Sequence, residues 1–144
     1  MFFLAELPTR QMIDSYANRF APGHGEVIEE MLVLLRQAST LIRQLDAYFA
    51  AHDLSQLKFL ILIVIDREPD RDWLSLSEIA GRLDVSRPVV SRTVRALVEG
   101  ELLSERPEPT DKRSSQLHIT LKARARLEAV LPGYFEIIAR QHQG

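Results

Sequence analysis

The stretch from Ser75 to Glu99, SLSEIAGRLDVSRPVVSRTVRALVE, constrains the fold more than any other part of the chain. Ser75 and Glu78 have the S-x-x-E spacing of a capping box, in which the hydroxyl and the carboxylate each accept a backbone N–H at the start of a helix. Apolar residues then recur at i, i+3, i+4 and i+7, which predicts an amphipathic helix of about two turns. These residues are Leu76, Ile79, Ala80 and Leu83.

A second helix is predicted to follow after a tight turn. Asp84-Val85-Ser86 interrupts the apolar pattern, and Ser86 is a suitable N-cap for the next helix. Pro88 is tolerated there because the amides of the first turn have no acceptor within the helix. The stretch therefore predicts two short helices joined by a turn.

The second predicted helix has two unlike faces. At 100° per residue, Val90, Val94 and Leu97 fall together and face a core. The opposite side and the N-terminal end carry guanidinium groups, hydroxyls and small apolar groups, with no acid before Glu99. The residues on this surface are Ser86, Arg87, Pro88, Val89, Ser91, Arg92 and Arg95.

These side chains suit the edges of DNA bases. Arginine pairs bidentately with guanine, serine bonds to phosphates or base edges, and a small apolar group contacts the thymine methyl. An outward face of this kind predicts a recognition helix for double-stranded DNA. The alternative is a solvated surface, which is the commoner fate of arginines on a helix.

A β-hairpin is predicted directly after this helix. Gly100 ends the helix, and the segments 101–106 and 116–119 alternate between apolar and polar residues as strands do. The polar, proline-bearing segment between them forms the tip and presents Lys112 and Arg113. His118 falls on the polar side of the second strand, where an exposed histidine is favoured over a ligand.

Helices are also predicted on both sides of this region. Their ranges are Thr9 to Phe20, Glu26 to about Ala51, Gln56 to about Asp66, and Leu121 to about Gln141 with a kink at Pro132, while Trp73-Leu74 is predicted as a short strand. Residues 1–8 are predicted to be a loose start. The segment from Gln56 to Asp66 is apolar all round, so periodicity alone leaves a buried helix and a buried strand open.

Composition limits the class of protein. A chain of 144 residues with 46% hydrophobic residues holds one modest domain. It has no cysteine, its four histidines are scattered, and it lacks a glycine-rich phosphate loop or a nucleophile–base arrangement, so neither a metal, a cofactor nor an enzyme is predicted. The longest apolar run is too short to span a bilayer, and no signal peptide is present, so we expect a soluble, cytoplasmic protein without a membrane partner.

Charge is unevenly distributed along the chain. The net charge is −2, but residues 82–126 sum to +4 and the remainder to −6. A basic segment within an acidic frame is the electrostatic pattern of a protein that presents one face to nucleic acid.

The predicted order of elements is helix, helix, strand, helix, turn, helix, hairpin, helix, and it resembles a MarR-family transcriptional regulator from about Glu26 to Ile138. The most specific likeness is Asp111-x-Arg113 followed by Leu117-x-Ile119-Thr120, which is similar to the family's D-x-R…v-x-L-T signature. The resemblance implies a mainly α fold with a small β-hairpin wing. Residues 54–120 would form the winged helix-turn-helix lobe, and residues 1–53 and 121–144 the dimerisation helices of the same unit.

The resemblance also implies roles for individual residues. The recognition helix would enter the major groove, and Arg113, with Lys112 beside it, the adjacent minor groove. Asp111 would orient the wing arginine or an arginine of the recognition helix. The chain would act as a homodimer on a pseudo-palindromic operator, as a repressor that responds to a small anionic or phenolic effector.

The effector site stays unidentified. Tyr48, His52, Lys58 and Phe59 lie near the implied junction, but none is in a ligand motif and each is more simply structural or solvated. The alternative function is a winged-helix module that binds another protein and no DNA.

Three departures from the family pattern matter. In the family the strand usually follows a glycine directly, whereas here Glu101 stands between Gly100 and the strand. Glu105, with Arg106 beside it, occupies a position where arginine is common, which predicts the loss of one contact to the DNA backbone. The family's further C-terminal helix has no counterpart here. We therefore expect the helix from Thr9 to Phe20 to pack on the dimerisation helices in its place, in the same or the other subunit.

Overall fold

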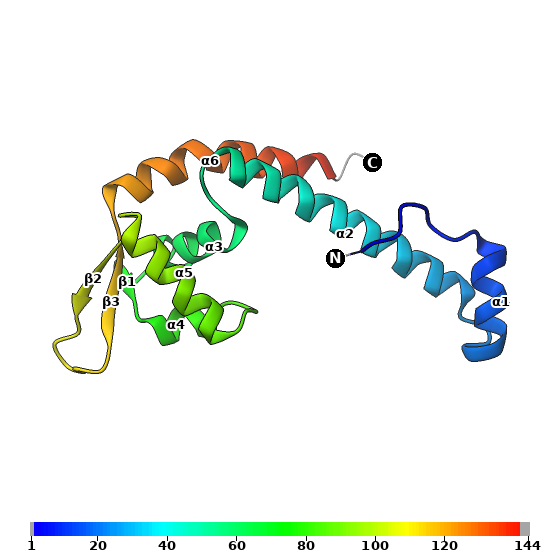
Figure 1. Cartoon of the computed structure of the whole chain (residues 1–144), viewed down its shortest axis with the longest axis horizontal. Helices are drawn as coiled ribbons and strands as arrows, with labels where there is room; N and C mark the ends of the chain where they lie inside the picture. The colour runs from blue at the N-terminus through cyan, green and yellow to red at the C-terminus, as the bar shows by residue number, and fades with distance from the viewer. Residues whose placement is uncertain (1, 142–144) are drawn as a thin grey trace. The chain divides into compact units, whose positions relative to one another are not determined.

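The computed structural model describes residues 2–141. The chain forms two compact units that divide between Leu45 and Asp46. The fold is mainly helical with a small antiparallel sheet, as predicted (Figure 1). The elements are α1 (Arg10–Phe20), α2 (Gly25–Ala51), α3 (Gln56–Asp66), β1 (Trp73–Leu74), α4 (Leu76–Gly81), α5 (Arg87–Glu99), β2 (Leu103–Pro107), β3 (Ser115–Ile119) and α6 (Leu121–Arg140).

The first unit contains the N-terminal segment, α1 and most of α2. Thr9 caps α1 by accepting the N–H of Met12, and Ile13 and Ala17 are buried. Arg10 on α1 lies 3.1 Å from the Glu29 carboxylate on α2. α1 therefore packs against α2 of its own chain.

The N-terminal segment is irregular but anchored. The N–H of Phe2 donates to Ser39 Oγ at 3.3 Å, and the Arg36 guanidinium donates to the carbonyl oxygens of Leu4, at 2.7 Å, and Ala5. Ser39 is consequently buried although it is polar. The predicted loose start is thus held on α2 by hydrogen bonds.

The core of the second unit surrounds α3. Ser55 caps this helix by accepting the N–H of Lys58, and Ile61 and Leu62 are fully buried. Neighbouring elements cover α3 on several sides, which explains why its sequence is apolar all round and confirms the helix over the strand.

An aromatic cluster joins the end of α2 to α3 and α6. The ring of Phe59 lies 4.6 Å from that of Phe49 and 4.7 Å from that of Tyr134. Tyr48 donates its hydroxyl to the carbonyl of Val130 at 2.7 Å and crosses α6 at Gly133, where a Cβ would lie 2.3 Å from the Tyr48 oxygen. Glycine at this position thus permits the close contact. Tyr48 and Phe59 have structural roles here.

The sheet has the order β1-β3-β2, with both pairs antiparallel. Leu117 on β3 pairs with Leu74 and Glu105, and His118 pairs with Trp73 and Ser104. The prediction of an exposed His118 is wrong, because this residue is only 7% exposed. β3 is the central strand and both of its faces are covered, whereas the prediction assumed one solvated face.

The connection from α5 to β2 has a left-handed residue. Gly100 follows α5, as predicted, but its φ is −81°, and the positive φ of 61° belongs to Glu101. The N–H of Leu102 donates to the carbonyl of Leu97 at 2.9 Å, and that of Glu101 to Val98 at 3.0 Å. These two bonds form a Schellman motif, which turns the chain into the wing.

No single helix among residues 2–141 is long and apolar enough to cross a membrane, and α2 and α3 reach that length and composition only when they are counted together.

Candidate nucleic-acid interface

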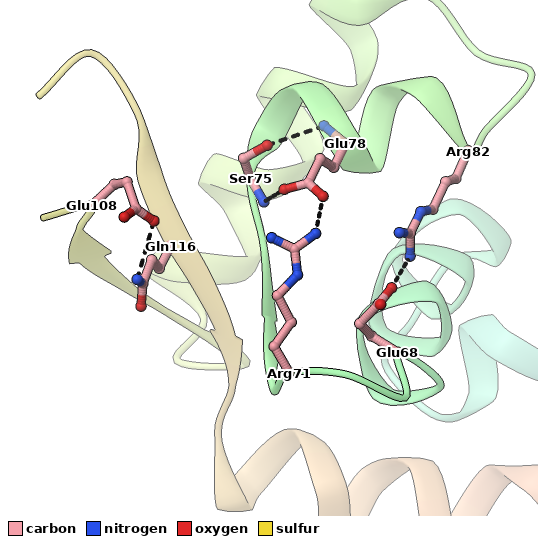
Figure 2. A network of polar contacts seen from close by, with 7 residues as sticks. All are labelled: Glu68, Arg71, Ser75, Glu78, Arg82, Glu108 and Gln116. Atoms are coloured by element: carbon pink, nitrogen blue, oxygen red, sulfur yellow. Dashed lines mark hydrogen bonds and ion pairs between the residues drawn. The ribbon is translucent and has the colours of Figure 1, made fainter. Parts of the chain in front are cut away.

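The first helix of the pair is fixed at its N-terminus. Ser75 Oγ accepts the N–H of Glu78 at 3.2 Å, and the Glu78 carboxylate accepts the N–H of Ser75 at 3.2 Å, so both halves of the predicted capping box form. Glu78 also pairs with Arg71 (Figure 2). The Arg71 guanidinium lies 4.4 Å from the centre of the Trp73 ring. α4 is thereby tied to β1.

The same contacts shift the titration of Glu78. Burial alone would raise the pKa of this carboxyl, but hydrogen bonds from Arg71 and Ser75 outweigh burial and hold the pKa below its ordinary value. Arg82, at the end of α4, makes a further ion pair with Glu68 at 2.5 Å (Figure 2). Ion pairs thus hold both ends of this helix.

α5 presents its predicted faces. Val90, Val94 and Leu97 are buried. Ser86 has the extended backbone of an N-cap, but its side chain makes no capping hydrogen bond, so only the position of this cap was predicted correctly. Ser86 is exposed at the N-terminal end of α5.

A groove of about 750 Å³ is bordered by α5, by the start of α4 and by the wing, which comprises β2, β3 and the turn between them. Four of the predicted DNA-contacting residues line it, namely Arg87, Ser91, Arg95 and Arg113. The other five lie outside its lining. Of these, Ser86, Pro88, Arg92 and Lys112 are exposed, and Val89 is half-buried.

Sequence reasoning missed several residues of the groove. Three come from the start of α4, and the others come from the end of α5 and from the wing. They are Ser75, Leu76, Ser77, Val94, Val98, Glu99, Ser114, Ser115 and Leu117. Glu105 also lines the groove, at the position where the sequence predicts the loss of one backbone contact, and strand alternation places it on the same face of the sheet as the buried Leu103.

The cations of this surface lack ion-pair partners. Within residues 2–141, no carboxylate lies within 4.0 Å of the guanidinium groups of Arg87, Arg92, Arg95 and Arg113 or of the Lys112 ammonium. Six arginines elsewhere in the chain do have such partners, namely Arg10, Arg71, Arg82, Arg124, Arg126 and Arg140. The unpaired cations are available for an external anion.

Asp111 shapes the tip of the wing. Its carboxylate accepts the backbone N–H of Arg113 at 3.0 Å, and its carbonyl accepts the N–H of Ser114 at 3.1 Å. Asp111 thus sets the direction of the Arg113 backbone. It forms no ion pair with an arginine side chain among residues 2–141, so the expected contact with a guanidinium is absent from the described part of the chain.

A chain of hydrogen bonds runs along the wing from Glu108 to His118. Gln116 donates Nε2 to the Glu108 carboxylate at 3.1 Å (Figure 2), and its Oε1 lies 3.0 Å from His118 Nε2. Because that amide oxygen only accepts, His118 donates through Nε2. Hydrogen bonds from Gln116 and Thr110 lower the pKa of Glu108, and burial together with the charge of Arg106 lowers the pKa of His118 despite the opposing effect of Asp72.

Comparison with known proteins identifies relatives of this chain. Residues 52–114 match the family model described as MarR family. The HTH-type transcriptional repressor YetL of Bacillus subtilis is 30% identical over 136 residues, which cover 94% of this chain and 81% of YetL. These descriptions are of transcriptional regulators and not of enzymes, in agreement with the prediction from the sequence.

Two solved structures from Streptomyces coelicolor have the same fold. AbsC, a MarR family transcriptional regulator, superposes with a TM-score of 0.75 at 16% identity and covers 85% of this chain and 81% of its own. Sco3205, a MarR family regulator solved in complex with DNA, also has a TM-score of 0.75, at 18% identity, with coverage of 85% and 76%.

Proposed function

The chain belongs to the MarR family of transcriptional regulators, and on that premise we propose that it binds double-stranded DNA sequence-specifically through α5 and the wing. The observation that carries the proposal is the set of unpaired cations, of which Arg87, Arg95 and Arg113 line one groove. α5 enters the major groove as a recognition helix, and Arg113 enters the adjacent minor groove. Sco3205, a protein of the same fold, was solved in complex with DNA, which supports DNA as the partner.

Assembly as a homodimer completes the proposal. α1 and α2 expose Met12, Tyr16 and Phe20 and then Val27, Met31, Leu34, Leu35 and Ile42, and α6 exposes Phe135 and Ile138. Apolar surface of this extent normally marks an interface. Residues 1–53 and 121–144 therefore pair two subunits, and the two lobes at 54–120 read a pseudo-palindrome in successive major grooves.

The transcriptional output is repression, which the name of YetL supports. Control by a small anionic or phenolic effector stays a prediction from the family resemblance. The alternative of a protein-binding module is less favoured, because such a role gives no reason for unpaired arginines along α5 and the wing tip.

Selection of binding sites from random duplexes tests the function without a prior choice of operator. We expect enrichment of one inverted repeat with half-sites about one helical turn apart. If no sequence is enriched and binding to all duplexes is equally weak, the protein is not a sequence-specific DNA-binding regulator and the protein-binding alternative gains.

A further inference from the structure

Glu105 places a carboxylate on the groove side of the wing. It pairs in register with Leu117, and residues paired in an antiparallel ladder point to the same face of a sheet. Leu117 is buried and lines the groove together with Glu105. Arg106 pairs with Gln116 and points to the other face, where it lines a separate cavity beside His118. Arg106 therefore does not place its positive charge in the groove beside the Glu105 carboxylate.

The Glu105 carboxylate has no structural partner. Within residues 2–141 it accepts no side-chain hydrogen bond and forms no ion pair, and the residue is exposed. Glu78 and Glu108 differ in this respect, because Glu78 binds Ser75 and Arg71, and Glu108 binds Gln116 and Thr110. The Glu105 charge thus contributes nothing visible to the fold.

A free carboxylate in a groove that binds DNA repels the negatively charged phosphates of the DNA backbone. We propose that Glu105 limits the affinity of the protein for DNA by repelling the backbone that passes along the wing. This inference rests on the proposed function. The repulsion acts on the phosphates of any sequence, so it lowers specific and non-specific binding together and leaves base recognition to α5.

The variant Glu105→Gln tests the proposal, because glutamine keeps the shape and removes the charge. We expect binding to become about threefold to tenfold tighter at low salt on both the selected site and a random duplex, with a gain that shrinks as salt is raised. Glu105→Arg adds a phosphate contact, so its slope of log affinity against log salt should steepen by about one. The melting temperature of Glu105→Gln should equal that of the wild type, since no bond is lost.

Glu128→Gln is the matched control. It makes the same change of charge at an exposed residue of α6 that has no part in the groove. Unchanged or weaker binding by Glu105→Gln, or an equal gain from Glu128→Gln, would overturn the assignment of Glu105. Failure of the wild type itself to bind any duplex would instead overturn the proposed function, so the two failures are distinguishable.

Discussion

At the scale of single residues, Glu101 carries an avoidable conformational cost. A left-handed conformation costs an L-residue other than glycine roughly 1–2 kcal/mol. Glycine removes this cost, but it also raises the conformational entropy of the unfolded chain, which cancels part of the gain in stability. Glu101→Gly should therefore stabilise the protein by about 0.5–1 kcal/mol in urea unfolding. Asp53, with φ of 56°, ends α2 in the same way, and Asp53→Gly should gain less because aspartate tolerates this region better. A loss of stability in Glu101→Gly would contradict the account.

His118 links stability to pH. Its pKa is lowered from 6.5 in the folded state by burial first and by Arg106 second. Between the folded pKa and 6.5 the unfolded chain binds more protons, so the His118 contribution is complete above pH 6.5 and is lost as pH falls below it. The drop in unfolding free energy from pH 7.5 to pH 5.5 should be smaller in His118→Gln than in the wild type. Equal drops would show that the pKa of His118 is the same in the folded and the unfolded protein.

At the scale of elements, the helices were predictable because their signals are local. The capping box at Ser75, the cap at Ser55 and the apolar stripe of α5 all act within a few residues. What failed depends on distant partners. The burial of His118 follows from the pairing of β3 with a strand on each side, and the left-handed Glu101 follows from how α5 joins β2.

The wing allows a prediction about DNA shape. Arg113 lies at a tip whose turn is fixed by Asp111, so its guanidinium can enter a narrow minor groove. Arg113→Ala should weaken binding most on operators with A·T-rich flanks and should lower the salt slope by about one. Affinities measured on operators that differ only in their flanks test this. The same loss on every flank would make Arg113 an ordinary phosphate contact.

At the scale of the whole molecule, α1 is predicted to contribute to the dimer. Its exposed side chains Met12, Tyr16 and Phe20 line an apolar groove of about 430 Å³ that also includes Ile28 and Leu32. Deletion of residues 1–22 should weaken dimerisation in sedimentation experiments, and DNA affinity should fall with it because both half-sites must be engaged at once. Tyr16→Asp keeps the chain whole and should act in the same direction. A truncated protein that forms an equally tight dimer would show that α1 is not needed for assembly.

The central claim is that the outward side of α5 reads bases. The most direct measurement is the affinity of Arg92→Ala and Arg95→Ala for the selected operator and for operators with single base changes. Arg67→Ala serves as the control, since Arg67 is exposed and belongs neither to α5 nor to the wing. We expect losses of about 1–3 kcal/mol for a base-reading arginine, with relaxed preference at one base pair, and no loss for the control. The claim would be contradicted if both α5 variants bound with the affinity and the base preference of the wild type.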